Sequence, residues 1–493
     1  MSTSVHETER KYEAPTGVAL PDLADLPGVA ASAGPEEQRL EAVYYDTADL
    51  RLARAGLTLR RRVGGDDAGW HLKLPVAEDT REEVRLPPGR AAKHPPKELN
   101  SLVQVHARGD ELTPVARIRT TRQRWQLVDD RGRLLVEVVE DLVSAQDVAD
   151  ESVDSWREIE VELGEGGDRA LLDQVERRLT EAGITRSTSS AKLTRLLAGR
   201  LAPEPPAPKR GKTAGDVVLA YLREQADALK HQDPRVRRRE EDAVHQMRVA
   251  TRRMRSALQA FGKVVERDRT RELTDELKWF AGVLGAARDA EVMRAGYEAN
   301  VAKLDDTLVL GPVSALLTRH FAPLEAGAHE AATTAMNSRR YFALLDAVDA
   351  LIADPPLTPL ARVKAKDVLP EFVVKAYKRL AGNAENAHDD ESLHESRKAA
   401  KRLRYAVETV EPLYGKKAKK YRKHLKGLQT LLGDHQDSVV ARPVLRELGG
   451  QAHLEGENGF TFGLLYGLEE AKAARAEERF PTVWRDLGKP KFV

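Results

Sequence analysis

A basic helical stretch that occurs twice constrains the fold of this sequence more than any other feature. The first copy begins at His245 and reads HQMRVATRRMRSALQAF, and the second begins at His394 and reads HESRKAAKRLRYAVETV. Farther along, the stretch 277–293 overlays 425–441, and the register between the copies shifts by only one residue. A long-period internal repeat sets the architecture of a chain. The second half is therefore predicted to be a duplication whose shared feature is a basic helix.

Length and composition bound the class of protein. The chain has 493 residues, which is too long for a single core and predicts roughly two to four domains. The formal net charge of +1 averages over clusters of opposite sign. The chain has no cysteine, which fits a reducing cytoplasm. The N-terminus has no apolar core for a secretory signal, and no run of about 18 apolar residues could span a membrane, so no membrane partner is expected.

Apolar and charged residues alternate with period two through residues 5–163. In the stretch 57–63, for example, the leucines face one way, whereas Arg60 and Arg62 face the other. Similar alternation is found in the segments 6–13, 70–75, 122–127, 134–142 and 156–163. This periodicity predicts antiparallel strands with one buried face, and Gly/Asp clusters such as 64–69 supply the hairpin turns.

The charged faces of these strands are sorted by sign. Two strands carry mainly acids at alternating positions, and three carry mainly bases. For one strand alone, a solvated face is the simpler interpretation, but a solvated face usually mixes signs. Opposed acidic and basic walls suit a divalent cation and a polyanion, because carboxylates coordinate Mg²⁺ while Arg and Lys neutralise phosphate oxygens. A barrel with a polar interior is the natural container for them.

The N-terminal region resembles the CYTH family, also called triphosphate tunnel metalloenzymes. Glu7-Thr8-Glu9-Arg10-Lys11 matches the ExExK signature of that family. Further elements follow in family order at 44–62, 70–75, the Arg-rich strand ending in Trp125, 158–163 and 189–197. The resemblance covers residues 5–200 and implies an eight-stranded tunnel that binds triphosphate with Mg²⁺ or Mn²⁺. It makes an inorganic triphosphatase, a thiamine triphosphatase or an adenylate cyclase the expected kind of enzyme. No base-recognition element is evident, which favours hydrolysis of inorganic tripolyphosphate.

The same resemblance implies the roles of individual residues. The implied catalytic residues are Glu7, Glu9 and Lys11. The implied metal ligands are Glu7, Glu9, Glu158, Glu160 and Glu162. The implied phosphate-binding residues are Lys11, Arg60, Arg62, Lys73, Arg122, Arg124, Lys192 and Arg195. The choice among Arg119, Arg122 and Arg124 stays open, because a shift of one residue exchanges the two faces of a strand.

A Pro-rich basic segment at 201–212 has no apolar periodicity and predicts a linker. Beyond it, residues 213–490 follow the period of 3.6 that is typical of amphipathic helices. The whole chain is thus predicted to be an α+β two-domain protein. An antiparallel β-barrel tunnel comes first, and an all-α duplicated helical bundle follows, in which each copy of the repeat forms one bundle.

The two basic helices, predicted at 245–261 and 394–410, carry their charges on one face. His245, Arg248, Arg252 and Arg255 are spaced 0, 3, 7 and 10, and the second copy repeats the spacing. The opposite side is apolar and is predicted to pack in the bundle; it holds Met247, Met254, Leu258, Phe261, Leu403, Val407 and Val410. A solvated face is the usual explanation for such a stripe. Few acids lie on these stripes, however, and the pattern occurs in both copies, which favours binding of an anion.

The second half resembles the CHAD domain, a conserved-histidine α-helical module. The motifs that carry this resemblance are HQMRVATRRMRS, LGAARDAEV (284–292), HESRKAAKRLRY and LGDHQDSVV (432–440). The resemblance implies a basic groove that binds inorganic polyphosphate, formed by His245, Arg248, Arg252, Arg255, Lys278, His394, Arg397, Lys398, Lys401, Arg404 and Lys426. The motifs 284–292 and 432–440 are predicted to be loops. Asp289 and Asp437 in them are interpreted as helix caps or partners of basic side chains.

Two other functions stay open on the sequence alone. The protein could be a binding or scaffold protein whose tunnel only senses triphosphate. It could also bind nucleic acid, although single-strand binders add aromatic stacking platforms and the basic stripes hold essentially one aromatic residue, Tyr405. Nucleic acid is therefore the less favoured partner. The expected location is the cytoplasm, where a polyphosphate ligand would be compatible with association with polyphosphate granules. The sequence does not specify an oligomeric state.

Overall fold

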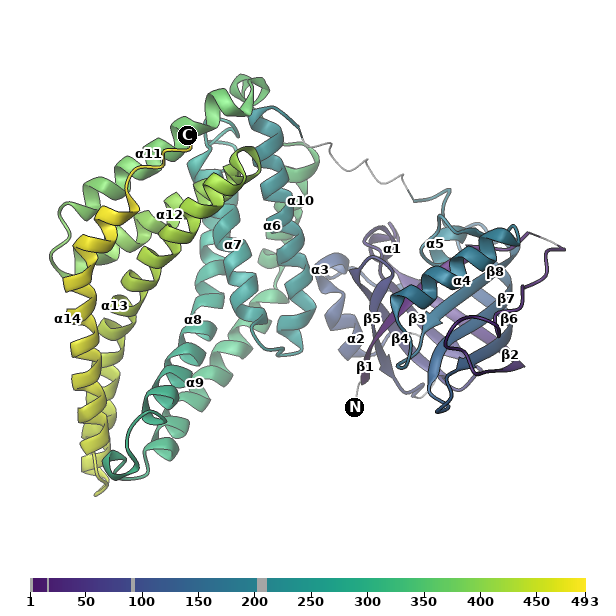
Figure 1. Ribbon diagram of the computed structural model, residues 1–493, viewed down its shortest axis with the longest axis horizontal. Coiled ribbons are helices and arrows are strands. Elements are labelled where there is room, and N and C mark those ends of the chain that lie inside the picture. The colour runs from purple at the N-terminus through teal and green to yellow at the C-terminus, as the bar shows by residue number, and fades with distance from the viewer. Residues whose placement is uncertain (1–2, 16, 90–93, 202–210) are drawn as a thin grey trace. The chain divides into compact units, whose positions relative to one another are not determined.

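The chain folds into two compact units, Met1–Pro205 and Pro206–Val493 (Figure 1). The structure is a computed structural model that describes residues 3–15, 17–89, 94–201 and 211–493. Most of the linker predicted at 201–212 lies outside the described residues. The first unit combines strands and short helices, and the second contains the long helices. The predicted order of an α+β barrel domain followed by an all-α domain is confirmed.

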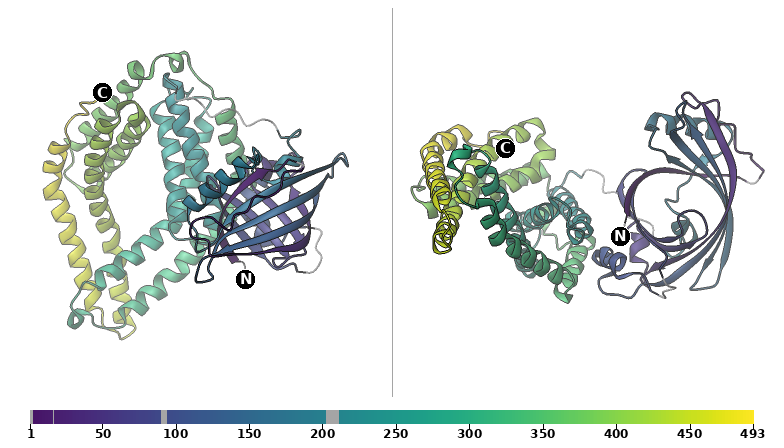
Figure 2. Two further views of the ribbon diagram at one scale, coloured as in Figure 1. Left: turned by 45° about the vertical axis from the view of Figure 1, so that its right-hand side comes forward. Right: turned by 90° about the horizontal axis from the view of Figure 1, so that it is seen from below.

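The first unit is a closed antiparallel barrel. Its strands are β1 (Thr3–Glu13), β2 (Ala31–Asp46), β3 (Thr58–Val63), β4 (Gly69–Ala77), β5 (Thr80–Leu86), β6 (Thr113–Val128), β7 (Leu134–Asp147) and β8 (Val153–Leu163). They pair in the order β5-β4-β3-β2-β6-β7-β8-β1, and β5 also pairs with β1, which closes the barrel. The short strand β9 (Thr185–Arg186) pairs with the end of β1. In the right-hand view of Figure 2 the strands curve around the interior.

Strand alternation separates a polar interior from an apolar exterior. Val138 and Val161, for example, face outward and pack under α4 (Arg169–Glu181) with Leu172 and Val175. Two further apolar clusters on the outside involve the short helices α1 (Arg51–Arg54), α2 (Lys97–Leu102), α3 (Gln104–Ala107) and α5 (Lys192–Leu196). Each buried Val or Leu contributes roughly 1.5–3 kcal/mol. The barrel is thus held together largely from outside, and its lumen is left for charged residues.

The second unit is helical and duplicated. Its helices are α6 (Ala214–Arg237), α7 (Ala243–Ala260), α8 (Arg271–Val301), α9 (Val313–Met336), α10 (Arg339–Ala353), α11 (Ala365–Ala384), α12 (Asp390–Tyr414), α13 (Lys416–Leu454) and α14 (Phe460–Leu487). The first basic stretch lies on α7 and the second on α12. These two helices also pack against each other, so the two copies belong to one compact unit.

The apolar sides of α7 and α12 are in the core, as predicted. Met247, Met254 and Phe261 have no exposed surface, and neither have Leu403 and Val407. The basic residues of both stripes are therefore turned away from these cores.

The two motifs predicted as loops are helical, so that prediction is wrong. Residues 284–292 lie within α8, and 432–440 lie within α13. A helical glycine usually costs about 1 kcal/mol relative to alanine. At Gly285, however, a Cβ would lie 3.4 Å from the guanidinium of Arg248, so the glycine leaves room for that side chain. A tertiary contact thus offsets the local preference that suggested a loop.

No helix in the described residues is both long enough and apolar enough to cross a membrane.

Candidate functional site

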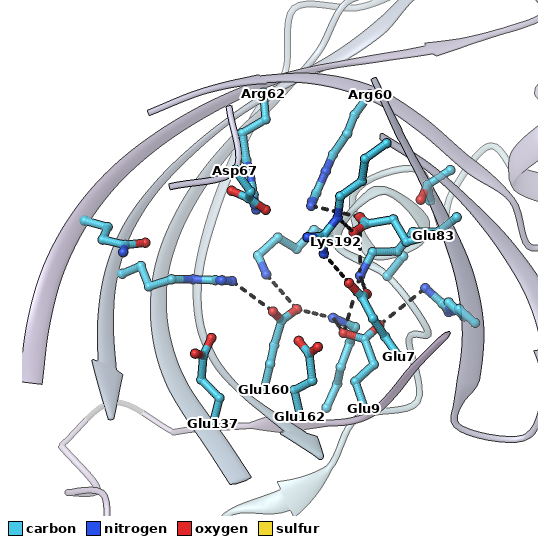
Figure 3. Close-up of a pocket in the computed structure, with 18 of the residues that line it drawn as sticks. Glu7, Glu9, Arg60, Arg62, Asp67, Glu83, Glu137, Glu160, Glu162 and Lys192 are labelled. Atoms are coloured by element: carbon cyan, nitrogen blue, oxygen red, sulfur yellow. Dashed lines mark hydrogen bonds and ion pairs between the residues drawn. The ribbon is translucent and has the colours of Figure 1, made fainter. Parts of the chain in front are cut away.

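A charged cavity of about 240 Å³ lies inside the barrel (Figure 3). Acidic and basic side chains line it in nearly equal number, and Tyr44 is its one aromatic lining residue among the described residues. Figure 3 shows the glutamates of β1 and β8 gathered on one side, while Arg60 and Arg62 of β3 extend from the opposite side. The cavity therefore has an acidic wall and a basic wall, which is the arrangement that the strand patterns predict.

Most of the residues predicted for this site line the cavity. They are Glu7, Glu9, Lys11, Arg60, Arg62, Lys73, Arg122, Arg124, Glu160, Glu162 and Lys192. The structure also resolves the open choice on β6. Arg122 and Arg124 face inward, whereas Arg119 is on the outside, where its Nε lies 3.0 Å from Glu41 Oε1.

Two predicted residues do not line the cavity. The guanidinium of Arg195 lies 4.8 Å from the centre of the Trp156 ring and 3.8 Å from Glu13 Oε1. Glu158 accepts a hydrogen bond from Trp156 Nε1 at 2.5 Å and lies beside Lys192. Both residues are therefore placed to support the cavity wall rather than to contact a ligand inside it.

The sequence reasoning missed the contribution of β5. Arg81, Glu83 and Arg85 alternate along this strand and all line the cavity. Glu83 is almost completely buried and lies 3.0 Å from His71 Nδ1, while Arg85 Nη2 donates to Glu7 Oε1 at 2.5 Å. The signal was present, because residues 80–86 show the same period-two alternation as the segments that were identified.

The carboxylates of the acidic wall differ in how well their charges are balanced. Burial raises the pKa of Glu9, but Lys11 and Lys73 outweigh it, and the pKa falls to about 2. Burial also raises the pKa of Glu162, where the negative charges of Glu7 and Glu9 act in the same direction, and it reaches about 8. Among the described residues, no hydrogen bond or ion pair involves the Glu162 side chain. Lys73 acts to lower this pKa, but burial and the neighbouring carboxylates outweigh it, and Glu162 has no ion-pair partner among the described residues.

The donor set on this wall fits a divalent cation. Mg²⁺ and Mn²⁺ prefer oxygen ligands, and Glu7, Glu9, Glu160 and Glu162 all face the cavity. A cation there would remove the repulsion that raises the pKa of Glu162. Opposite charges in a low-dielectric site attract far more strongly than in water, so the benefit is large.

A second carboxylate group is already satisfied by a lysine. Oxygens of Asp141, Glu158 and Glu160 lie within 4.8 Å of one another. However, Lys192 Nζ lies 2.8, 2.7 and 2.8 Å from these three residues. Burial lowers the pKa of Lys192, but the three carboxylates outweigh it and raise the pKa well above its ordinary value. The ammonium thus occupies the position that a metal would need, so the metal is expected on the side of Glu162.

The guanidinium groups of the basic wall repel one another. Burial, together with Arg60 and Arg122, lowers the pKa of Arg62 to about 9. Two aspartates of the loop between β3 and β4 contact this wall: Asp67 pairs with Arg62, and Asp66 lies 3.1 Å from Arg124. Both aspartates line the cavity.

Replacing Glu162 with glutamine is expected to stabilise the metal-free protein. Because the folded-state pKa of about 8 lies above the ordinary 4.5, ionisation of Glu162 destabilises the fold increasingly as pH rises from about 4.5 to about 8. At pH 8, Glu162→Gln should raise the free energy of unfolding by at least about 1 kcal/mol in EDTA. Chemical denaturation with EDTA and with Mn²⁺ measures this. The wild type should gain more from Mn²⁺ than the variant, and equal gains would exclude Glu162 as a ligand.

In the helical unit, the basic stripes of α7 and α12 converge. Burial lowers the pKa of Lys401 on α12, and the charges of Arg252, Arg397 and Arg248 lower it further, to about 7. Burial and the α7 residues Arg252 and Arg248 also act to lower the pKa of Arg397. The stripes of the two copies therefore form one strongly positive region, which we call the stripe surface: His245, Arg248, Arg252, Arg255, His394, Arg397 and Lys401.

Acidic partners of the stripes come from the neighbouring helices. Arg248 Nη1 lies 2.8 Å from Asp289 on α8, and Arg397 Nη2 lies 3.7 Å from Asp437 on α13. The interpretation of these aspartates as partners of basic side chains is confirmed, whereas the helix-cap interpretation is wrong because both lie inside helices. His394 Nδ1 contacts the side-chain oxygen of Gln436, which also lies on α13.

Four other residues predicted for the groove are not part of the stripe surface. Arg404 donates to the largely buried Glu408 at 2.9 Å and to Gln429 at 3.0 Å, so its charge is already paired. Lys398 pairs with Glu395 at 2.6 Å, and Lys278 and Lys426 are exposed on α8 and α13. The structure thus brings together the central part of the predicted groove and leaves these four residues at its margins.

A charged barrel tunnel followed by a duplicated helical domain with a basic surface defines the class of CYTH–CHAD two-domain proteins. The CYTH domain family matches residues 5–197, and the CHAD domain family matches residues 220–446. The chain belongs to these families.

The chain is similar over nearly its whole length to two uncharacterised proteins of Mycobacterium tuberculosis, from strains CDC 1551 and H37Rv. Each is 36% identical over 512 residues, covering 98% of this chain and 96% of the relative. Among solved structures, PptA from Streptomyces chartreusis is 24% identical and covers 55% of this chain and 99% of its own, with a TM-score of 0.48. The CHAD domain of the plant Ricinus communis is 28% identical and covers 58% of this chain and 94% of its own, with a TM-score of 0.47.

Proposed function

We propose that the barrel hydrolyses inorganic triphosphate with Mg²⁺ or Mn²⁺ and that the helical domain binds inorganic polyphosphate. One observation carries the enzymatic part: Glu162, a carboxylate without an ion-pair partner among the described residues, shares one cavity with a wall of mutually repelling arginines. Such a site is completed by a metal ion and a polyanion together. We also propose a cytoplasmic location, with which the lack of cysteine is compatible.

The residues of the two walls have different roles in phosphoryl transfer. Arg60, Arg62 and Arg122 bind the non-bridging phosphate oxygens and neutralise the charge on them. The carboxylates Glu7 and Glu9 hold the divalent ion, which supplies further charge neutralisation and activates water when bound. Lys11 and Lys73 hold these carboxylates in place. Since the walls face each other, water on the acidic side can attack the terminal phosphorus in line with the leaving diphosphate.

The size and lining of the cavity favour an inorganic substrate. Its volume of about 240 Å³ is below the ~300–1,000 Å³ that is typical of pockets for larger organic ligands. Tyr44 is the one aromatic residue in the described lining, and its hydroxyl accepts a hydrogen bond from Arg60 at 3.3 Å. A nucleobase would therefore find little to stack on. This supports tripolyphosphate over a nucleotide as the substrate, and hydrolysis over cyclisation.

The stripe surface favours a bare phosphate chain over nucleic acid. Single-stranded nucleic acids are held by stacking of bases on exposed aromatic side chains. Tyr405, the aromatic residue within the stripes, is only 8% exposed. Competition tests this choice: an excess of single-stranded DNA should fail to displace long-chain polyphosphate from the protein. Ready displacement would instead favour nucleic acid as the ligand.

Polyphosphate affinity is expected to fall as pH rises above 7. Lys401 has a pKa of about 7 in the free protein, because burial and the charges of Arg252, Arg397 and Arg248 lower it while Asp437 opposes them. A bound anion raises this pKa, so binding takes up a proton above pH 7 and weakens as protons become scarce. Titrations between pH 6 and pH 9 measure the slope. Lys401→Arg, which stays charged, should flatten it, and an unchanged slope in this variant would contradict the role of Lys401.

A protein that binds triphosphate without hydrolysing it remains the second candidate. The same cavity would support it, because anion binding needs only the basic wall. The assay of phosphate release described in the Discussion separates the two functions.

A further inference from the structure

A cluster of exposed lysines covers the first turns of α13. We call it the lysine patch, and it consists of Lys416, Lys417, Lys419, Lys420 and Lys423. All five are exposed, and none makes a hydrogen bond or ion pair with another described residue. Like charges three and four residues apart on a helix destabilise it slightly. A surface that keeps them without partners is therefore a candidate for binding an anion.

The patch forms the outer face of this part of α13. Ala418, Tyr421 and Leu425 point to the core and are at most 7% exposed. Arg422 also turns inward, where its Nε lies 2.7 Å from Glu411 on α12. The lysines occupy the remaining side and extend over about 10 Å of helix, at 1.5 Å per residue.

Comparison of the two copies shows that three of the five lysines of the patch are particular to the second copy. Leu277 of α8 corresponds to Leu425 of α13. In the same register, Lys416, Lys420 and Lys423 of the second copy correspond to Asp268, Glu272 and Asp275 of the first. The stripes are basic in both copies, but the charge is reversed at these three positions, whereas Lys417 and Lys419 correspond to Arg269 and Arg271. The requirement that keeps the stripes basic therefore does not explain Lys416, Lys420 and Lys423.

The patch continues the stripe surface along α12 and α13. Arg404, at the far end of the second stripe, donates to Gln429 of α13 at 3.0 Å. Lys426 is exposed one turn from Gln429 and leads to Lys423, the nearest member of the patch. A chain that leaves the stripes beyond Arg404 therefore meets positive charge again on α13.

We propose that the lysine patch is a second binding segment for a long phosphate chain and gives the protein its preference for long over short chains. This proposal rests on the polyphosphate binding proposed above. Lysine suits the task, because its ammonium is a mobile point charge that needs no fixed geometry of its partner. The patch has no exposed aromatic or large apolar side chain, so it offers neither a stacking platform for bases nor an anchor for a lipid bilayer.

The test restores the residues of the first copy in the full-length protein. Lys416→Asp, Lys420→Glu and Lys423→Asp are introduced together. Affinity is then measured for a long polyphosphate and for a short one. The short chain is no longer than one basic stripe, which spans about 15 Å at a rise of 1.5 Å per helical residue. The long chain should lose at least about tenfold in affinity and show a shallower salt dependence, because fewer counterions are released. The short chain should bind as before, and unchanged binding of it also shows that the variant is folded.

A matched variant controls for net charge. Lys303, Arg339 and Lys366 are also exposed and lie outside the patch and the stripes, so their replacement by glutamate changes the charge equally. This control should keep the preference for long chains. Equal weakening of both chain lengths by the patch variant, or no weakening of either, would overturn the proposal. So would loss of duplex DNA binding with unchanged polyphosphate binding, which would make nucleic acid the occupant. If the wild type binds no polyphosphate of any length, the proposed function itself fails.

Discussion

Replacing Glu7 and Glu9 together with glutamine should reduce phosphate release from tripolyphosphate by at least about a hundredfold, since single electrostatic groups in active sites are worth 10²–10³. Both carboxylates face the cavity on β1, where Glu7 Oε2 lies 2.7 Å from Lys73 and Glu9 Oε2 lies 3.4 Å from Lys11. The change keeps the shape of the side chains but removes the charge that holds the divalent ion. Phosphate release with saturating Mg²⁺ or Mn²⁺ measures the effect.

The control for this variant is Glu41→Gln. Glu41 lies on β2 of the same barrel, but it is exposed on the outside and pairs with Arg119. This variant should hydrolyse tripolyphosphate at the rate of the wild type. Retained binding of polyphosphate by the Glu7/Glu9 variant would show that the helical unit is intact. Equal rates of hydrolysis in wild type and Glu7/Glu9 variant would exclude the enzymatic assignment and leave a protein that only binds triphosphate.

Neutralising the centre of the stripe surface is expected to abolish retention of polyphosphate. Arg248, Arg252, Arg397 and Lys401 are the residues at which the stripes of α7 and α12 converge. Replacing all four with glutamine should weaken binding by at least about a hundredfold near physiological salt, because each lost phosphate contact also removes a released counterion. Hydrolysis of tripolyphosphate should be unchanged, since these residues belong to a different unit from the tunnel.

A second quadruple variant tests whether position or mere charge matters. Lys303, Arg339, Lys366 and Arg479 are exposed basic residues of the same unit, and none belongs to a stripe. Glutamine at these four positions should leave polyphosphate retention close to that of the wild type. If both quadruple variants lost binding equally, the ligand would be responding to net charge. If the stripe variant lost hydrolysis as well, the two activities would not have separate sites.

Local patterns were sufficient to predict much of the barrel site. Period-two alternation placed Arg60 and Arg62 on one face of β3 and Glu160 and Glu162 on one face of β8, and the structure has all four in the cavity. The alternation predicts this well because a strand has only two faces, so the face of one side chain determines the faces of its neighbours. It could not choose between Arg119 and Arg122, because that choice depends on the register with β2 and β7.

In the helical half, sequence patterns predicted the basic faces but not the helical structure of the two motifs. The spacing of the repeats predicted one basic face on each of α7 and α12, and the burial of Met247 and Leu403 agrees with it. The 432–440 motif was misread because its glycine and aspartates are typical of turns. Inside α13 these residues instead contact the second stripe: Asp437 lies near Arg397, and Gln436 contacts His394. Local propensity is a weak guide where such tertiary contacts are available.

The sequence by itself determined the order of the two domains, the duplication, and which residue types share a face. These properties depend on neighbours along the chain, through periods of 2 and 3.6 residues. Only the tertiary structure decided how charges from distant segments combine. It placed Lys192 among three carboxylates, left Glu162 without an ion-pair partner among the described residues, and brought Arg248 and Lys401 from separate copies into one positive region. Coulomb interactions depend on distance in space and on burial, and neither can be read from separation along a chain.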